Sequence, residues 1–591
     1  MIVGVDTGGT FTDVVDENGD VVKVLSRRDD PAGAVATGLG GRRPDLLCHG
    51  TTIATNALLE RQGASVALVT NRGFADVIEI ARQDRPSLYD QWADRPEPLV
   101  PRHLRLEVDG RLDADGVELE PVGRAPKVPD EVQAVAVCLL HADLNAAHEA
   151  AVAGELRSRG YDVTASTEVS PEFREYERTV TTVANAYLRP VCAPYLERMG
   201  DLADDVLVMT SAGGLVPARD AAHLPAALLL SGPAGGVQAA AAAAAAAGFA
   251  DAVSFDMGGT STDVCLILGT VPEPAPGRTA GGFPIRLPSL DIHTIGAGGG
   301  SIARIDAGGA LAVGPRSAGA DPGPAAYGRG GTEPTVTDAD LALGRIPADA
   351  TFGNLGRLDV DAARRALDGA GVAAQGVVDV VDAAMERAVR LVSVERGVDP
   401  SGLALVAFGG AGPLHACAVA EALGMAAVVV PPRAGVLSAV GLVTSPRQRE
   451  LVRSWPTPGD TEGVEHALHE LALEAGKAVG GADADVSTAL DCRYAGQSHE
   501  LTVATVDEFP DEHKCRNGYA RPGAPVEVVA LRARAKRPAH LSYDDLRPAG
   551  ERKPIVGPAV LAESDCTVWV PDGWKAEVGG GGAWILRPSR S

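Results

Sequence analysis

The sequence lacks several features that define other classes of protein. No apolar run is long enough to cross a bilayer, and the nearest candidate, the alanine run at 239–247, lacks bulk and ends at Gly248. No charged-then-apolar leader opens the chain, because its first residues already have the pattern of a β-strand. The eight cysteines include no C-x-x-C pair, which is typical of reduced core cysteines. We therefore expect a cytoplasmic protein that does not bind membranes.

Positive charge is also in short supply. The chain has 53 Lys and Arg against 78 Asp and Glu, a formal net charge of −25. Such a surface repels nucleic acid and anionic membranes, so neither is an expected partner. An anionic ligand must then be held locally, by backbone amides, single Arg side chains and metal. The length of 591 residues and the 45% hydrophobic content describe a globular protein of several domains.

One short motif occurs twice. Residues 2–15 read IVGVDTGGTFTDVV, and residues 252–264 read AVSFDMGGTSTDV, one domain length further along the chain. The positions that are identical in the two copies are Asp6/Asp256, Gly8/Gly258, Gly9/Gly259, Thr10/Thr260, Thr12/Thr262, Asp13/Asp263 and Val14/Val264. Two unrelated tight turns are the alternative explanation, but a repeat at this spacing favours a duplicated fold with a ligand between its halves.

The motif has the composition of a phosphate-binding β-hairpin. Its paired glycines permit positive φ and let an oxygen-rich ligand approach the backbone. Free backbone N–H groups and the hydroxyls of Thr10 and Thr12 can donate to phosphoryl oxygens. Asp6, at the end of the first strand, can hold a hydrated Mg²⁺ or orient a nucleophile.

A later glycine-rich turn suits a nucleoside. A strand predicted over 403–408 passes through Gly409, Gly410 and Gly412 into a helix. A turn of this kind lets a flat base and ribose lie against the backbone.

Three other segments supply weaker candidates. His49, Thr52 and Asn56 lie in HGTTIATN, where a strand passes into a helix; they either edge a ligand pocket or form a capped helix with a buried histidine. Arg82 lies in a polar loop, where it is either solvated or clamps an anion. Asp291 and His293 precede the turn GAGGG and either line a cleft or are structural.

The two hairpins and the later turn resemble the phosphate-1, phosphate-2 and adenosine motifs of the actin/sugar-kinase/Hsp70 ATPases. The segments GGTFTD, HGTTIATN, SGPAGG, GAGGGSIA and RYAGQ further resemble the A subunit of the hydantoinase/5-oxoprolinase family, the N-methylhydantoinase A type. These matches follow the order of the family over nearly the whole chain.

This resemblance implies an α/β fold in which two RNase-H-like domains, as in actin-like ATPases, close over a nucleotide cleft. We expect the first domain at 1–200, with the first hairpin and an insertion, and the second at 201–450, with the second hairpin and the adenosine motif. After about residue 450 the pattern changes to short alternating strands. We therefore expect a separate β-rich domain at 451–591.

The resemblance also implies an activity, the ATP-dependent opening of a cyclic amide such as a hydantoin or 5-oxoproline. Transfer of the γ-phosphoryl group to the amide oxygen would give an imidate-like phosphate that water can attack, with ATP and Mg²⁺ as cofactors. The nucleotide-binding residues implied are Gly8, Gly9, Thr10, Thr12, Asp13, Gly258, Gly259, Thr260, Thr262, Asp263, Gly409, Gly410 and Gly412. Asp6 and Asp256 are expected to bind the metal through water or to act as the base. His49 and His293 are further catalytic candidates, and Thr52, Asn56, Arg82 and Asp291 are expected to handle the substrate.

In this family the A subunit usually works with a B subunit. No B-type region follows residue 591, so we expect a separate partner chain. Three alternatives remain open: a subunit of an acetone- or acetophenone-type carboxylase, which activates a ketone and bicarbonate with ATP; an ATP-binding subunit without chemistry of its own; and a sugar or acid kinase.

Overall fold

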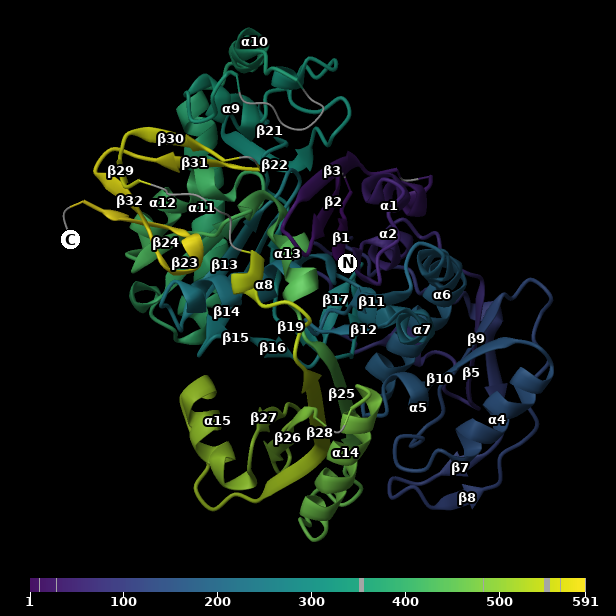
Figure 1. Cartoon of the computed structure of the whole chain (residues 1–591). Helices are drawn as coiled ribbons and strands as arrows, with labels where there is room; N and C mark the ends of the chain where they lie inside the picture. The colour runs from purple at the N-terminus through teal and green to yellow at the C-terminus, as the bar shows by residue number, and fades with distance from the viewer. Residues whose placement is uncertain are drawn as a thin grey trace.

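The computed structural model describes residues 1–9, 11–27, 29–349, 356–481, 483–546, 553–563 and 565–589. Two large mixed sheets form its centre, and helices cover them (Figure 1). None of the described helices is both long and apolar enough to cross a membrane. The molecule is thus an α/β protein organised around two sheets.

The first sheet has ten strands, in the order β27-β26-β28-β25-β12-β11-β4-β1-β2-β3. Its N-terminal unit consists of β1 (Ile2–Thr7), β2 (Phe11–Asp16), β3 (Val21–Leu25), β4 (Leu46–Thr51) and β11 (Asp205–Met209). Neighbouring strands among β1, β2 and β3 are antiparallel, whereas β4 is parallel to both β1 and β11. β4 is buried along its whole length, as expected for a strand covered on both faces.

The second sheet contains a five-stranded unit of the same design. It consists of β13 (Ala252–Met257), β14 (Thr262–Leu268), β15 (Val271–Pro272), β23 (Ala404–Phe408) and β24 (Ala427–Val430). The order β15-β14-β13-β23-β24 matches β3-β2-β1-β4-β11 strand for strand, with the same antiparallel and parallel pairings. The repeated sequence motif therefore corresponds to a repeated structural unit.

The segment after residue 450 is rich in strands, and most of these strands join the two large sheets. β25 (Arg447–Ser454), β26 (Asp485–Tyr494), β27 (Leu501–Val503) and β28 (Val526–Arg537) extend the first sheet. β29 (Ile555–Val556), β32 (Trp574–Val578) and β33 (Trp584–Pro588) extend the second. β11 and β12 (Leu215–Pro217), which follow residue 200, also belong to the first sheet. Short alternating strands can pair with any open sheet edge, so their local pattern does not reveal their partner.

Two helices pack against each other between the sheets. α8 (Gly232–Ala246) lies against β13 and β23, and α13 (Leu437–Thr444) lies against β1 and β4. They cross at Gly235 and Gly441, where a Cβ on Gly441 would lie 1.8 Å from the carbonyl oxygen of Gly235. The alanine run is thus part of a buried helix, and small side chains let the two halves approach closely.

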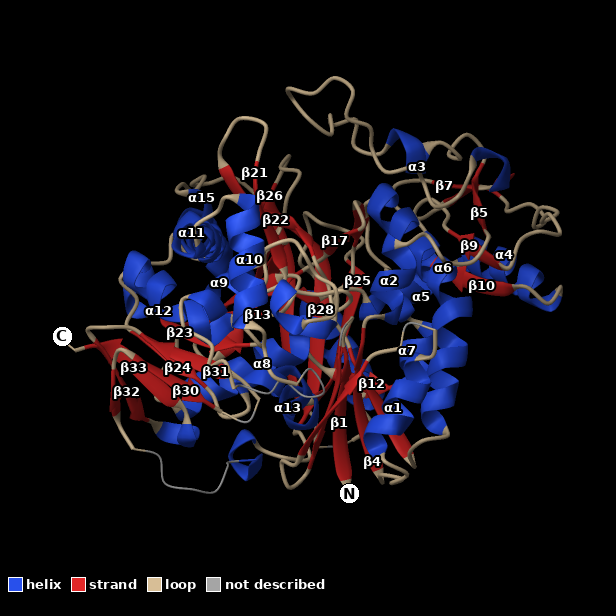
Figure 2. Cartoon of the chain, turned by 90° about the horizontal axis from the view of Figure 1, so that it is seen from above, coloured by secondary structure: helices blue, strands red, loops and turns tan. Residues whose placement is uncertain are grey.

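A four-stranded sheet forms an insertion at one side of the molecule (Figure 2). It contains β5 (Val66–Asn71), β6 (Arg105–Val108), β9 (Ala134–Val137) and β10 (Asp162–Ala165). The N-terminal part of the chain also contains the helices α1 (Pro31–Leu39), α2 (Ile53–Leu59), α4 (Ala147–Ser158) and α6 (Glu175–Gly200). The other long helices are α9 (Val336–Ala342), α10 (Val360–Ala370), α11 (Ala374–Val392), α12 (Gly412–Leu423), α14 (Val464–Ala478) and α15 (Phe509–Asn517).

Candidate functional site

The two repeated hairpins have the same turn geometry. The backbone N–H of Gly8 donates to the carbonyl of Phe11, and that of Gly258 donates to Ser261, each at 3.0 Å. In the first hairpin Asp6 pairs with Asp13, and in the second Asp256 pairs with Asp263. The duplication therefore extends to the register of the carboxylates.

The tips of both hairpins are open. A Cβ built on Gly9 or on Gly259 would have no atom within 4 Å. Thr260 is exposed beside Gly259, whereas Thr10 lies outside the described residues. The open glycines leave room for a ligand to approach the backbone of each turn.

Asp6, Asp13 and Asp263 all lie within electrostatic reach of Asp256, and all four carboxylates are half-buried. Burial, with the charge of Asp13, raises the pKa of Asp6 to about 7, and burial raises the pKa of Asp263 to about 6. The pKa of Asp256 is raised furthest, first by burial and then by the charges of Asp263, Asp6 and Asp13. Because Asp6 and Asp13 belong to the other hairpin, the two hairpins lie within electrostatic reach of each other. The site is therefore short of positive charge.

Lys23 supplies a cation that the sequence analysis missed. It lies opposite Asp13 on β3, and its Nζ is 3.0 Å from Asp13 Oδ1. In the sequence, nothing near this lysine marks it as a site residue, because it lies in an ordinary polar strand after the motif. Its importance is visible only once the register of the strands is known.

Thr12 and Thr262 do not point into the space between the hairpins. Both are fully buried; the hydroxyl of Thr12 bonds to Ser26 at 3.1 Å, and that of Thr262 donates to the carbonyl of Ala297 at 2.6 Å. Side chains alternate along a strand, so a threonine next to Asp13 or Asp263 faces the opposite side. The expectation that these hydroxyls hold phosphate is therefore corrected: they stabilise the frame of the hairpins.

The predicted nucleoside turn packs against the second hairpin. Gly409 has a φ of 79°, and a Cβ there would lie 2.4 Å from Asp256 Oδ1. The N–H of Ala411 donates to the carbonyl of Met257 at 3.0 Å. Gly410 is open, and Gly412 begins α12. The turn thus brings an open backbone segment beside Asp256.

The turn GAGGG also lies on the second hairpin, a contact that the sequence did not predict. The N–H groups of Gly299 and Gly300 donate to the carbonyls of Gly258 and Gly259 at 3.0 and 2.7 Å. These bonds fix the glycine pair from the side opposite the open tip. They explain why so many glycines are needed here, since a Cβ on Gly298 would lie 2.8 Å from Gly258 O.

Asp291 and His293 lie near this turn but not at the carboxylates. β20 (His293–Ile295) pairs with β14, and its Thr294 hydroxyl donates to Asp263. Because side chains alternate, His293 faces the other side of the strand. Asp291 pairs with Arg396. Thr294 is therefore the residue of this segment that reaches the carboxylates.

His49 has a structural place. It is fully buried, its Nδ1 donates to the carbonyl of Val5 at 3.0 Å, and its Nε2 accepts from the hydroxyl of Tyr195 at 2.7 Å. Burial lowers its pKa to about 4. With both ring nitrogens bonded and the imidazole neutral, His49 cannot exchange protons with a ligand. Of the two interpretations left open by the sequence, the structure favours the buried histidine.

Thr52 and Asn56 lie beside the first hairpin. Thr52 is the N-cap of α2, and its hydroxyl donates to the carbonyl of Thr7 at 3.4 Å. The exposed amide of Asn56 donates to Thr52 Oγ1 at 3.3 Å. Arg82 instead pairs with Glu177 on α6, with Nε 2.8 Å from Oε1. The first two thus remain near the carboxylates, and Arg82 is held by α6.

The N-terminus of α8 faces the same segment. A Cβ on Gly232 would lie 3.8 Å from Thr52 Cγ2. The hydroxyl of Ser231, which precedes α8, is buried and has no hydrogen-bond partner in the described part of the chain. Helix N-termini carry free N–H groups and partial positive charge, so they attract anions. This end of α8 lies close to Thr52, which bonds to the first hairpin.

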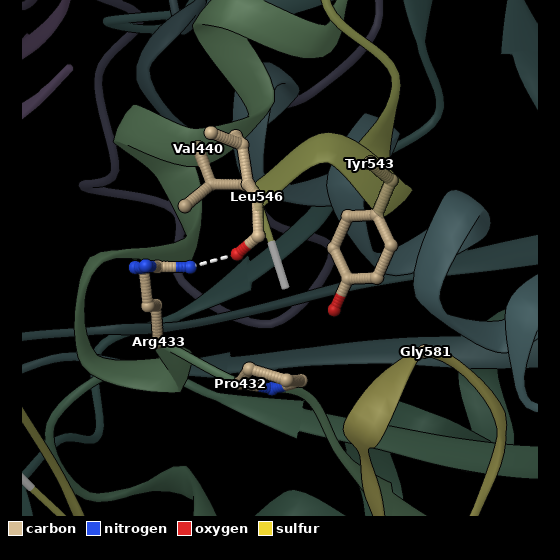
Figure 3. A pocket seen from close by; sticks show the side chains of 6 residues that line it. All are labelled: Pro432, Arg433, Val440, Tyr543, Leu546 and Gly581. Carbon is tan, nitrogen blue, oxygen red and sulfur yellow. Dashed lines mark hydrogen bonds between the residues drawn. The ribbon is translucent and has the colours of Figure 1, made fainter. Parts of the chain in front are cut away.

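A small pocket lies beside the segment that follows β24 (Figure 3). It is lined by Pro432, Arg433, Val440, Tyr543, Leu546 and Gly581. Arg433 donates to the carbonyls of Leu546 and, at 2.8 Å, Gly19. None of the predicted site residues lines this pocket. The two hydrogen bonds of Arg433 connect the turn after β2 with the C-terminal part of the chain.

The donor set fits a hydrated divalent cation. Within the described ranges, no three His, Cys, Asp or Glu side chains form a metal-binding cluster. Mg²⁺ usually keeps several waters and takes only one or two carboxylates together with phosphate oxygens. Asp6 and Asp256 can therefore hold Mg²⁺ only in company with water and a ligand.

Comparison with known proteins gives one consistent family. The model of the Hydantoinase/oxoprolinase family matches residues 178–450, and the model of the Hydantoinase/oxoprolinase N-terminal region matches residues 2–160. The crystal structure of ATP-dependent caprolactamase from Pseudomonas jessenii superimposes with a TM-score of 0.84 at 32% identity, covering 100% of both chains.

Three relatives show how varied the chemistry of this family is. Caprolactamase subunit alpha of Pseudomonas jessenii is 34% identical over 99% of both chains. 5-Oxoprolinase 1 of Arabidopsis thaliana is 34% identical over 74% of this chain, which matches only 41% of that longer protein. Acetophenone carboxylase gamma subunit of Aromatoleum aromaticum is 32% identical over 74% of this chain and 67% of its own length. The chain therefore belongs to the hydantoinase/oxoprolinase family.

Proposed function

We propose that this chain is the ATP-binding subunit of an enzyme that opens a cyclic amide with ATP. The observation that carries the proposal is the pair of Asp-x-Gly-Gly hairpins whose carboxylates, Asp6 and Asp256, lie within electrostatic reach of each other. The names of two relatives, caprolactamase and 5-oxoprolinase, support cyclic amides as the class of substrate.

The two five-stranded units are, in this proposal, the RNase-H-like halves of an actin-like ATPase. Support comes from their shared strand order and directions and from the electrostatic coupling between the aspartates of the two hairpins. The close crossing of α8 and α13 would serve as the contact about which the halves close.

The chain's residues suit the parts of a nucleotide. The open backbone at Gly9 and Gly259 would receive phosphate oxygens, and the turn at Gly410 would receive the nucleoside. Lys23 and the N-terminus of α8 would offset phosphate charge, and Asp6 and Asp256 would hold Mg²⁺ through water. Bound ATP would supply the phosphoryl group that activates the amide oxygen, because an amide C–N bond is otherwise a poor target for water.

Asp6 has a second task in this proposal. A general base works best when its pKa lies near the working pH, and burial raises the pKa of Asp6 to about 7. Asp6 would accept the proton of the attacking water, while Asp256 remains the principal metal residue.

A second subunit would complete the enzyme. The caprolactamase relative is a subunit alpha, and the acetophenone carboxylase relative is a gamma subunit. We therefore propose a B-type partner chain for this protein. The acetophenone carboxylase relative also favours a second candidate function, the ATP-dependent carboxylation of a ketone.

Phosphate release tests both functions. The chain, alone and with a B-type partner, is incubated with ATP, Mg²⁺ and 5-oxoproline, hydantoin, caprolactam, or a ketone plus bicarbonate. We expect phosphate release coupled to ring opening with at least one cyclic amide. Turnover only with ketone and bicarbonate would replace the amide proposal, and a stable phosphorylated product would indicate a kinase.

Variants connect the activity to the hairpins. Asp6→Asn and Asp256→Asn should each lower turnover at least 100-fold, because each removes a charge at the metal and base positions. Asp20→Asn is the matched control, since Asp20 is an exposed carboxylate on the same first unit. Turnover that survives in Asp6→Asn/Asp256→Asn would disprove the catalytic assignment.

A further inference from the structure

A short hairpin brings the C-terminal tail close to the nucleoside turn. β30 (Ala559–Ala562) pairs with β31 (Thr567–Val570), and the turn between them carries Asp565. The backbone N–H of Gly435, in the segment after β24, donates to Asp565 Oδ2 at 2.7 Å. A Cβ on Gly435 would lie 1.9 Å from the carbonyl oxygen of Asp565, so only glycine lets the tail come this close.

The segment after β24 contacts both the nucleoside turn and the first half of the molecule. The carbonyl of Ala434 accepts from the N–H of Gly409, the first glycine of the nucleoside turn, at 2.9 Å. The preceding residue, Arg433, donates to the carbonyl of Gly19 at 2.8 Å. Asp565 is therefore bound one residue beyond the contact that fixes the nucleoside turn.

The carboxylate of Asp565 also lies near the first hairpin. The pKa of Asp13 is raised, first by burial, and the charge of Asp565 adds to this rise while Lys23 opposes it. The two carboxylates are thus within electrostatic reach of each other. Asp565 is only half-buried, so solvent and ligands can approach it. It is therefore within reach of both the nucleoside turn and the first hairpin.

The turn that carries Asp565 is anchored to the second half. The N–H of Glu563 donates to the carbonyl of Cys566 at 3.0 Å, and its carboxylate accepts from Trp584 Nε1 on β33 at 2.7 Å. β31 packs against α12, the helix that begins at Gly412 of the nucleoside turn. The position of Asp565 is thus fixed by the sheet and the helix that also fix the nucleoside turn.

We propose that Asp565 accepts a hydrogen bond from a ribose hydroxyl of the nucleotide, so that the C-terminal tail completes the nucleotide site. This inference rests on the proposed function, in which Gly410 receives the nucleoside and the hairpins receive the phosphates. The ribose is the part of ATP that lies between those two ends, and Asp565 is within reach of both parts of the site. An ionised carboxylate only accepts hydrogen bonds, and ribose hydroxyls donate them, whereas phosphate oxygens would repel it.

Nucleotides that differ in one hydroxyl test the inference. Binding to the full chain is measured by calorimetry with Mg²⁺ and a non-hydrolysable ATP analogue, its 2′-deoxy form and its 3′-deoxy form. The native chain should bind the ribose form roughly 10-fold more tightly than at least one deoxy form. Asp565→Ala should lose this difference, because the ribose form then binds more weakly and that deoxy form does not. Equal affinity of the native chain for all three nucleotides would overturn the inference.

Inorganic tripolyphosphate with Mg²⁺ distinguishes ribose binding from a role at the metal. It has no ribose, so Asp565→Ala should leave its affinity unchanged. An equal loss of affinity for tripolyphosphate and for the ATP analogue would place Asp565 at the metal and overturn the inference. Asp572→Ala, at an exposed carboxylate of the same tail, is the matched control and should keep the preference for ribose.

Asp565→Asn separates binding from folding. The amide oxygen of asparagine can still accept from the N–H of Gly435, so the Tm should stay within about 2 °C of the native value. The lost charge weakens the bond to the ribose, so the preference for the ribose form should fall at least about 3-fold. A lowered Tm together with the full preference for ribose would make Asp565 a structural residue and overturn the inference.

The two proposals fail separately. Equal binding of the ribose and deoxy forms, with phosphate release on a cyclic amide, would keep the proposed function and remove the role of Asp565. A native chain that prefers ribose through Asp565 but releases no phosphate with any cyclic amide would keep that role and remove the proposed function.

Discussion

At the scale of single residues, the carboxylates of the two hairpins favour the binding of cations and lower the stability of the folded chain. Asp6 and Asp13 face each other across one hairpin, and both lie within reach of Asp256. Crowded carboxylates repel one another, so the site gains stability when cations enter it. Repulsion among these carboxylates therefore lowers the stability of the folded state.

Asp6→Asn should stabilise the protein in a pH-dependent way. The pKa of Asp6 is about 7 in the folded chain against 3.8 as its ordinary value, so the folded state holds more protons between these limits. Stability therefore falls as pH rises from about 4 to 7. The variant removes this fall and should gain up to about 4 kcal/mol at pH 8 and roughly 1–2 kcal/mol at pH 5. Urea unfolding at both pH values measures it, with Asp20→Asn as control; an equal change at both would contradict the assigned pKa.

His49→Phe tests the structural role of the buried histidine. The variant leaves the carbonyl of Val5 and the hydroxyl of Tyr195 without their partner, which should cost about 2–4 kcal/mol of unfolding free energy. ATP-analogue affinity of the folded fraction should change less than about twofold. Tyr195→Phe, which removes only one of these bonds, should cost less. Full stability with lost nucleotide binding would return His49 to the list of ligand residues.

The sequence predicted the relation between the two hairpins better than the direction of their side chains. The repeated motif is a local pattern that can be read from the sequence, and in the structure its two aspartates, Asp6 and Asp256, lie within electrostatic reach of each other. Thr12, by contrast, faces the frame, because the strand's alternation decides which side a residue meets. The role of Lys23 could not be predicted from the sequence, since its contact with Asp13 depends on the register of the strands.

At the scale of elements, the crossing of α8 and α13 depends on glycine. A Cβ on Gly441 would lie 1.8 Å from Gly235 O, and a Cβ on Gly4 would lie 2.5 Å from Ala439 O. Backbone atoms cannot give way as a flexible side chain does. The distance between the two hairpins is therefore set by small residues on the elements behind them.

Gly441→Ala should separate the two helices. We expect a loss of about 2–4 kcal/mol of unfolding free energy, because the added methyl group overlaps backbone, together with weaker nucleotide binding. Gly369→Ala in α10 is the control, since a Cβ there meets no atom within 4 Å and alanine favours helix. That variant should be neutral or up to about 1 kcal/mol more stable. Similar results for the two glycines would show that the crossing is not tight.

At the scale of the whole molecule, a buried ionic cluster joins distant parts of the chain. Arg532 on β28 bonds to Asp491 on β26 at 2.9 Å and to Glu450 on β25 at 3.2 Å, and it lies 3.5 Å from Glu172, which precedes α6. The C-terminal strands are thus tied to the first half by charge as well as by backbone pairing. The sequence could not predict this link, because Glu172 lies far along the chain from the three members that belong to the C-terminal strands.

Arg532→Met should destabilise the whole chain. It leaves three buried carboxylates without their shared cation, which should cost about 3–5 kcal/mol at pH 8. The loss should shrink at acid pH, where Glu172, whose pKa burial raises, takes up a proton. Thermal and urea unfolding at pH 5 and 8 measure both effects. Arg516→Met, at an exposed ion pair, is the control and should change stability by less than about 0.5 kcal/mol.

The division of the tail between the two sheets affects how the chain is made. β28 is the last strand of the first sheet to be made and β33 the last described strand of the second, so the first sheet stays incomplete until residue 537 and the second until residue 588 has left the ribosome. During most of its synthesis a nascent chain of this design has strand edges whose backbone N–H and C=O groups are unpaired. We therefore expect its yield in cells to depend on chaperones that cover those edges.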